Sequence, residues 1–345
     1  MILAHISYIS EGSRIFIVSF HMPLFFVISG ILIFIKNEKE RSLKDTAIHK
    51  LKSIMIPYFL YSLLGILIYI VYYLFTGRDG GWSAVISHII ETLTLYGFSV
   101  MWFLPAIFLS ELFFLLILKK PGNTGFLLPV SVLIPVAAAL ILNSNLEAAN
   151  ALYGTNPAFA VFHLFVVALL RVPVCASFIA AGYSASSLLP AVFSNEDNPV
   201  SGLLTPAEAF MGINLMGLTI VFSRINGVTD LHFLIFNNIL LYYLAALSGS
   251  FGVILIFRAL EGLSSAPPLR LLRYFGRNSL IIMVTHLNFY VLLAAEIGGM
   301  HFTKVLNEGV LKHFLFILLT LFFTLCGEVI LIEGINRVSL LLRRK

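Results

Sequence analysis

The apolar run from Ile15 to Ile35 most constrains what this chain can fold into, because it contains no Lys, Arg, Asp or Glu. An α-helix needs about 20 such residues to cross the hydrocarbon core of a bilayer. His21 and Pro23 lie in the first half of the run, where a simple anchor would carry Leu or Val. An ionisable side chain inside a membrane segment is costly and marks a functional-site hypothesis. The alternative is an interfacial histidine that donates to a carbonyl of a neighbouring helix.

The composition extends this conclusion to the whole chain. Its 345 residues are 59% hydrophobic and only 11% charged, whereas soluble domains carry roughly 25% charged residues. The apolar runs do not alternate with period two, which excludes a transmembrane β-barrel. We therefore expect an all-α polytopic membrane bundle that forms a single domain over residues 1–345. Cys175 and Cys326 both lie in apolar runs and predict neither a disulfide nor a metal site.

Hydropathy predicts nine complete membrane spans and part of a tenth. Met1 to Ser7 is a short apolar segment that ends at a polar turn, so we interpret it as the end of a first helix whose beginning is missing. The bundle would then hold about ten transmembrane helices, the first of them truncated. The complete spans are expected at residues 15–35, 54–76, 97–118, 125–143, 160–182, 203–223, 233–257, 278–299 and 313–336.

The positions of the basic residues test this arrangement. If residues 36–52 face the cytoplasm, alternation of the spans places 16 of the 22 Lys and Arg residues on that side and 5 on the other. Cytoplasmic loops carry such an excess of Lys and Arg, so we expect a multi-pass protein of the cell membrane with a cytoplasmic C-terminus. The net charge of +5 then reflects topology and does not indicate nucleic-acid binding.

Arg171 is the costliest of the ionisable residues inside the spans. Such residues usually face the bundle interior and find partners. One interpretation is a structural ion pair with Glu111 or Glu328. The other is an anion site for a phosphate or carboxylate, which a planar guanidinium suits. Several ionisable residues lie inside predicted spans, among them His21, Glu111, His163, Arg171, His286, Glu296 and Glu328.

Lys50, Lys52, Trp102, Ser279 and His286 have both a structural and a functional interpretation. Lys50 and Lys52 belong to a basic segment that can be a solvated positive-inside loop or can hold a phosphate-bearing cytoplasmic ligand. Trp102 would by default join the aromatic belt at the membrane interface. Ser279 or its neighbour would cap the eighth span, and His286 two turns later can be a satisfied interhelical donor.

Five segments carry a resemblance to a known family. His5 is followed in order by SFHMPLFFVISG, KLKSIMIPY, MWFLPAIFLSELFF and GRNSLIIMVTHL. This series resembles the acyltransferase 3 family of integral membrane acyltransferases, and within it the fucose 4-O-acetylase-like branch. The resemblance covers nearly the whole chain, although only four residues precede His5 where family members carry a complete first helix.

The resemblance implies transfer of an acyl group, usually acetyl, from cytoplasmic acyl-CoA to a hydroxyl of an extracytoplasmic glycan. Acetyl-CoA would be a substrate, and no permanently bound cofactor or metal is expected. The acceptor would be a cell-surface or lipid-linked glycan. His5 would be the general base and His21 would assist it, because a neutral imidazole can take a hydroxyl proton. We expect the donor to contact Lys50, Lys52 and Arg171, and the acceptor to contact Trp102, Ser279 and His286.

Two other classes of protein fit the same composition. A secondary transporter or glycan flippase would share the apolar content, but it often shows two similar halves, and no such duplication is present here. A catalytically inactive relative would fit the incomplete first helix. The acyltransferase is the leading hypothesis.

Overall fold

The computed structural model describes residues 2–77, 80–120, 127–188, 201–261 and 266–343. Within these ranges the chain is helical and forms no strand, which confirms the all-α class. Among the described residues, eight helices are long and apolar enough to cross a membrane. Arg78, Arg344, Lys345 and the first two residues of the predicted span 125–143 lie outside the described ranges.

The first half of the chain supplies four of these spans. The helices are α1 (Ile2–His5), α2 (Glu11–Ile35), α3 (Leu43–Lys50), a π-helical turn (Leu51–Met55), α4 (Ile56–Thr76), α5 (Gly81–Leu93), a 3-10 turn (Ser99–Trp102), α6 (Phe103–Leu118) and α7 (Leu127–Tyr153). Helix α3, the π turn and α4 form one continuous helical segment from Leu43 to Thr76 that contains an apolar window long enough to span the membrane.

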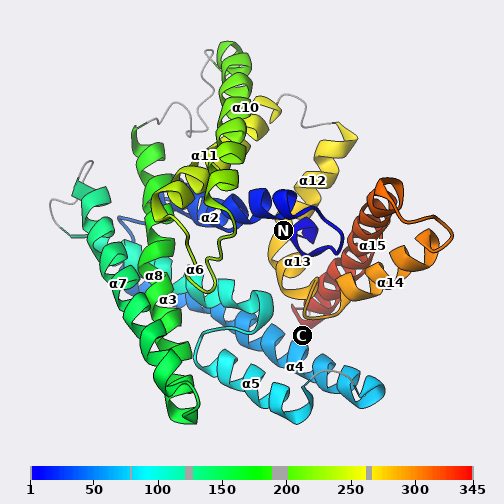
Figure 1. The fold of residues 1–345 in the computed structure, drawn as a ribbon. Coiled ribbons are helices and arrows are strands. Elements are labelled where there is room, and N and C mark those ends of the chain that lie inside the picture. The colour runs from blue at the N-terminus through cyan, green and yellow to red at the C-terminus, as the bar shows by residue number, and fades with distance from the viewer. Residues whose placement is uncertain (1, 78–79, 121–126, 189–200, 262–265, 344–345) are drawn as a thin grey trace.

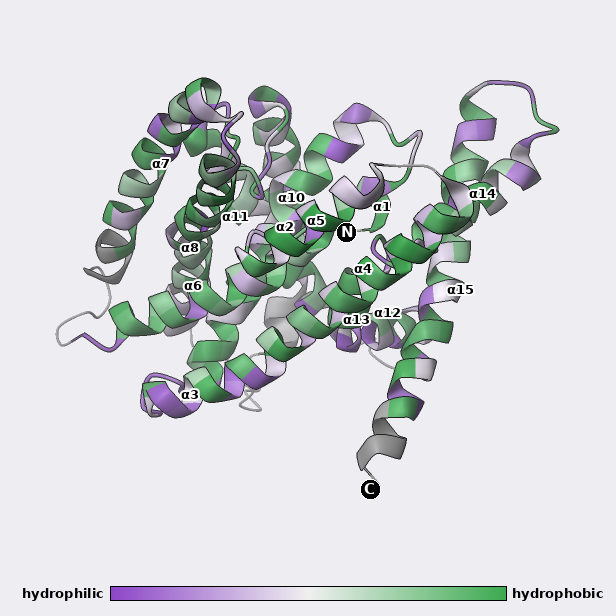
Figure 2. Ribbon diagram, turned by 90° about the horizontal axis from the view of Figure 1, so that it is seen from below, coloured by the Kyte–Doolittle hydropathy of each residue, from purple (hydrophilic) through white to green (hydrophobic). Residues whose placement is uncertain are grey.

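The second half supplies the other four. The helices are α8 (Pro157–Leu188), α10 (Ser201–Asn226), α11 (Ile239–Ala259), α12 (Pro267–Arg277), α13 (Ser279–Thr285), α14 (Val291–Thr303) and α15 (Val310–Arg343). Helix α2 crosses the middle of the bundle in Figure 1, and the α14–α15 pair lies to its side. The long helices carry mostly hydrophobic residues (Figure 2).

The prediction of one continuous span over residues 278–299 is wrong. The structure has α13 and α14 instead, with a break from His286 to Tyr290. Tyr290 lies in the left-handed region at φ 57°, and the amide of Leu292 donates to the carbonyl of His286 at 2.9 Å. Neither Pro nor Gly marks this break, so hydropathy alone shows one run of adequate length.

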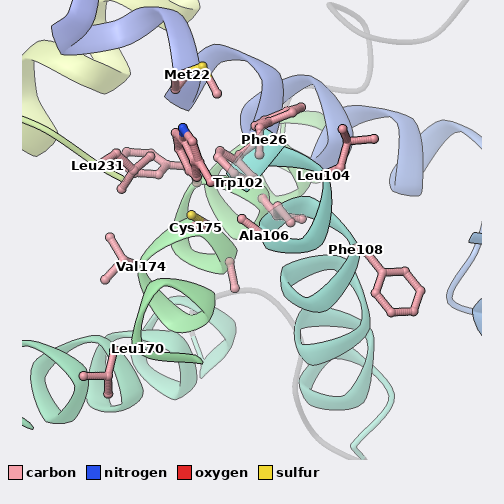
Figure 3. Packing of buried hydrophobic residues seen from close by; sticks show 14 of the residues in the cluster. Met22, Phe26, Trp102, Leu104, Ala106, Phe108, Leu170, Val174, Cys175 and Leu231 are labelled. Atoms are coloured by element: carbon pink, nitrogen blue, oxygen red, sulfur yellow. The ribbon is translucent and has the colours of Figure 1, made fainter. Parts of the chain in front are cut away.

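Close packing between α2 and α8 holds the centre of the bundle. A Cβ atom added at Gly30 would lie 2.0 Å from the carbonyl oxygen of Ile179, and one added at Gly182 would lie 2.0 Å from that of Val27. These glycines let the two backbones touch, as small residues do between membrane helices. The surrounding cluster includes Phe26, Trp102 and Cys175 (Figure 3).

A buried ion cluster ties the predicted cytoplasmic side together. The Lys50 ammonium lies 3.0 Å from Glu38 Oε2 and 2.9 Å from Glu111 Oε2. Ser29 donates to the other oxygen of Glu111. Lys119 donates to the carbonyl of Glu38 at 3.3 Å. The loop after α2 is therefore held against α3 and α6.

Candidate functional site

A cavity of about 670 Å³ lies where several chain segments converge. Its walls come from α1, the first half of α2, α5 and the loop after it, and the loop between α10 and α11. By alternation of the spans, these segments share the side predicted to be extracytoplasmic. The lining is Ala4, His5, Arg14, Val18, His21, Met22, His88, Glu91, Tyr96, Gly97, Ser99, Val100, Trp102, Leu164, Thr229, Asp230, Leu231, His232, Phe233, Met283 and Leu287.

His5 and His21, the two residues expected to do acid–base chemistry, line this cavity together. His21 Nδ1 lies 3.0 Å from the carbonyl oxygen of Ile17. A carbonyl can only accept, so Nδ1 carries the proton and Nε2 keeps its lone pair. His5 lies at the end of α1, where its ring is exposed to the cavity.

His286 lies behind His5 and is fully buried. The two ring centroids are 5.5 Å apart. His286 Nδ1 donates to the carbonyl of Ile282 at 2.7 Å, whereas Nε2 is buried and has no hydrogen-bond partner among the described residues. Met283 and Leu287 on either side of it reach the cavity wall, but His286 itself does not.

An aromatic wall formed by Tyr96, Trp102 and His232 lines the same cavity as His5 and His21. Trp102 stacks on His232 with centroids 5.2 Å apart and planes 6° from parallel, and Tyr96 packs on the same imidazole at 4.8 Å. Asp230 Oδ1 accepts from the backbone amides of His232 at 2.7 Å and Phe233 at 3.2 Å. This turn fixes His232 against Trp102.

Burial sets the charge of this wall. It lowers the pKa of His232 to about 2, with a further contribution from Arg171, so the imidazole is neutral at physiological pH. Burial also raises the pKa of the Asp230 carboxyl above its ordinary value, against the two amide hydrogen bonds. Burial raises the pKa of Tyr96 to about 12, so its phenol stays protonated.

Arg171 supports the wall from behind. Its Nη1 donates to the carbonyl of Tyr96 at 3.0 Å, and its guanidinium carbon lies 4.5 Å from the Tyr96 ring centroid and 5.5 Å from that of Trp102. Such cation–π contacts strengthen when they are desolvated. Its Nε and Nη2 have no hydrogen-bond partner in the described part of the chain.

The ion pair considered for Arg171 is not formed. Glu111 pairs with Lys50, and Glu328 accepts from the hydroxyl of Thr285 at 2.7 Å. The aromatic rings replace a carboxylate as its partners, because the loop after α5 folds back over α8. Nothing in the spacing of the apolar runs signals that loop.

A second polar group on the cavity wall lies on α5, between two of the predicted spans. His88 and Glu91 are one helical turn apart on α5, with Nδ1 3.5 Å from Oε2, and the His88 ring stacks on Phe98 at 4.7 Å. Their i,i+3 spacing in an amphipathic stretch between two spans was the available signal. Asp230 and His232, also in a loop between spans, carried no comparable pattern.

The remaining predicted site residues do not meet at the cavity. Lys50 lies in the ion cluster on the opposite side, and Lys52, two residues later, is exposed. Ser279 begins α13 two turns before His286 and is half-buried. The three residues predicted to bind the donor are thus not brought together: two lie on the predicted cytoplasmic side, and Arg171 lies beneath the aromatic wall.

These features define the class: a polytopic helical membrane protein with a titratable cavity formed by loops and helix ends on one side. The family model Acyl_transf_3, described as an acyltransferase domain, matches residues 1–333. The chain therefore belongs to this acyltransferase family, and its general activity is that of a membrane acyltransferase. No curated protein matches the chain, and no solved structure matches it.

Proposed function

We propose that this chain is an O-acetyltransferase of the fucose 4-O-acetylase-like branch. It moves the acyl group of cytoplasmic acetyl-CoA to a hydroxyl of an extracytoplasmic glycan. The observation that carries the proposal is one cavity whose lining includes His5, His21, Trp102 and Asp230. This arrangement places bases beside a surface suited to sugars.

The acceptor side of the cavity has saccharide chemistry. Trp102 lines the cavity although its ring stacks on His232 and lies beside Arg171, and the part of the indole that reaches the cavity can contact the C–H groups of a sugar. Carboxylates at Glu91 and Asp230 and imidazoles at His88 and His232 surround it with groups that bond to hydroxyls. Ligand sites combine an apolar surface with a few polar groups in this way.

The reaction needs one proton to move twice. His5 takes the proton of the acceptor hydroxyl as its oxygen forms a bond to the thioester carbon. The carbon–sulfur bond then breaks, the electron pair leaves with the CoA sulfur, and the protonated His5 returns its proton to that thiolate. The products are an acetyl ester and CoA thiol. His21 Nε2, which keeps its lone pair, can accept a hydrogen bond from the acceptor.

The donor would enter from the predicted cytoplasmic side. Lys52 is exposed there and suits a phosphate as a point charge. Lys50 is already neutralised by Glu38 and Glu111, so it would have to leave these carboxylates to bind CoA. We place the protein in the cell membrane with a cytoplasmic C-terminus, because the excess of basic residues marks that side.

Sealed membrane vesicles of known orientation test this proposal. Acetyl-CoA labelled in the acetyl carbon is supplied on the cytoplasmic side, and a fucose-containing oligosaccharide on the other. The expected result is labelled ester on the oligosaccharide and release of free CoA in equal amount. No transfer to any of a panel of hexose and deoxyhexose acceptors would overturn the proposal.

The same assay separates the rival functions. A flippase would move a lipid-linked glycan across the vesicle membrane without acetyl-CoA and without labelling it. An inactive relative would do neither. Mass spectrometry of surface glycans from cells with and without the gene adds an independent readout, because an acetyltransferase leaves a mass difference of one acetyl group.

A further inference from the structure

We infer that His286 is a positioning residue, which holds His5 in the tautomer that can act as a base, and that it does not contact the substrate. This inference rests on the proposed function for its catalytic consequence. Its structural part stands separately and concerns two rings from distant parts of the chain, at the end of α1 and at the break after α13.

Burial excludes direct substrate contact by His286. Its exposed fraction is 0%, and it is absent from the cavity lining that includes Met283 and Leu287. His5, by contrast, lines the cavity. His286 therefore acts on the cavity through a neighbour, and the neighbouring ring is that of His5, with centroids 5.5 Å apart and planes inclined by 53°.

The hydrogen bonds fix which nitrogen of His286 can act. Nδ1 donates its proton to the carbonyl of Ile282 at 2.7 Å, so Nε2 is the lone-pair nitrogen of the neutral ring. That nitrogen is buried without a partner among the described residues. Leaving a buried acceptor unpaired destabilises the folded protein. No His5 nitrogen is hydrogen-bonded to it in this structure, but the centroid separation of 5.5 Å is short enough that a turn of the His5 ring brings one of its N–H groups to about 3 Å from Nε2.

Both rings are anchored by contacts to the last two helices. Thr285, the residue before His286, donates to Glu328 of α15 at 2.7 Å. The amide of Ser7, two residues after His5, donates to Glu296 of α14 at 2.7 Å. The break between α13 and α14 begins at His286, where the amide of Leu292 donates a hydrogen bond to the His286 carbonyl. This break places the His286 side chain beside His5.

The consequence for His5 follows from its two nitrogens. When one ring N–H is donated to His286, the other nitrogen carries the lone pair and faces the cavity. A neutral histidine without this acceptor would divide between two tautomers, and only one of them could take the acceptor proton. The role matches that of the group that orients a catalytic base in a nucleophile–base relay.

Two variants separate this role from a structural one. His286→Gln keeps an acceptor oxygen near the position of Nε2, whereas His286→Leu keeps the volume and removes the acceptor. We expect His286→Leu to lower kcat at least tenfold with the KM for the acceptor unchanged, and His286→Gln to restore most of kcat. His301→Leu, an exposed histidine of α14, is the matched control. A raised KM with normal kcat would overturn the inference and favour substrate binding.

A double-mutant cycle tests whether His286 acts through His5. In a His5→Gln background, His286→Leu should change the residual rate by less than twofold, because its partner is gone. An undiminished tenfold loss in that background would contradict the inference. Thermal unfolding in detergent shows whether each variant remains folded.

A measurement without turnover separates this inference from the proposed function. Nitrogen NMR of the ¹⁵N-histidine-labelled protein in lipid reports the tautomer of each ring. We expect His5 to be a single neutral tautomer in the wild type and a mixture in His286→Leu. The same mixture in both proteins would refute the inference even if acyl transfer is observed. A single tautomer in the wild type that is lost in the variant would support it even if no transfer is found.

Discussion

Lys50 and Glu111 form a buried ion pair, with Nζ 2.9 Å from Oε2, that joins the segment entering the second span to α6. Glu38 completes the cluster from the loop after α2 at 3.0 Å. Removing either partner of a buried ion pair destabilises the protein, because the charge that remains is buried without a counter-charge. The basic segment of the sequence is thus part solvated loop and part structural clamp.

Replacing Lys50 by Met should destabilise the protein by about 3–5 kcal/mol, because two carboxylates then lose their counter-charge. Thermal unfolding in detergent measures this loss. Lys52→Met is the matched control, since Lys52 is exposed two residues away, and it should leave the unfolding temperature within a degree. Equal stability of the two variants would show that the cluster does not hold this side together.

Gly30→Val should prevent correct folding, because its Cβ would meet the carbonyl oxygen of Ile179 at 2.0 Å and backbone cannot move aside. Size-exclusion chromatography of the expressed protein checks this. Gly217→Val is the control, since a Cβ there meets nothing within 4 Å. A monodisperse Gly30→Val protein with normal unfolding temperature would rule out the close approach of α2 and α8.

Trp102→Ala should raise the KM for the glycan acceptor about fivefold, since contact with an aromatic ring contributes on the order of 1 kcal/mol. Trp102→Phe should keep most of the affinity. The matched control is Trp82→Ala, because Trp82 is 58% exposed on α5 while Trp102 is 7% exposed. An unchanged KM for the acceptor in Trp102→Ala would show that the aromatic wall does not contact the acceptor.

Acid should weaken the aromatic wall through His232. Its pKa is lowered to about 2 by burial, while the unfolded chain would bind a proton near pH 6.5. The unfolded state therefore binds more protons below that pH, so stability falls as the pH drops below about 6.5. Comparing unfolding temperatures at pH 7.5 and 5.5 should show a larger drop in the wild type than in His232→Gln. The same drop in both proteins would contradict this assignment.

The order and class of the spans could be predicted because hydropathy and charge act over whole helices. Eight of the nine complete spans have a counterpart among the apolar helices. The break at His286 could not be foreseen, since Tyr290 adopts its left-handed conformation without any Gly or Pro to announce it. A long apolar run looks the same whether it is continuous or broken.

The candidate site was only partly predictable for a different reason. His5, His21 and Trp102 belong to motifs, and the structure gathers them at one cavity. His232 reaches it from a loop and Glu91 from the short helix α5, both between spans, where polar residues are ordinary and need no explanation. The partners of Arg171 depend on how one such loop folds over α8, which is tertiary information that no local pattern contains.

The most direct test of the account is acyl transfer by His5→Ala in oriented vesicles. Loss of the general base should lower kcat by about 10²–10⁴-fold, with the unfolding temperature little changed because the His5 ring is exposed to the cavity. His49→Ala, an exposed histidine on α3, should retain the wild-type rate. A folded His5→Ala protein that transfers acetyl groups within twofold of the wild type would contradict the account.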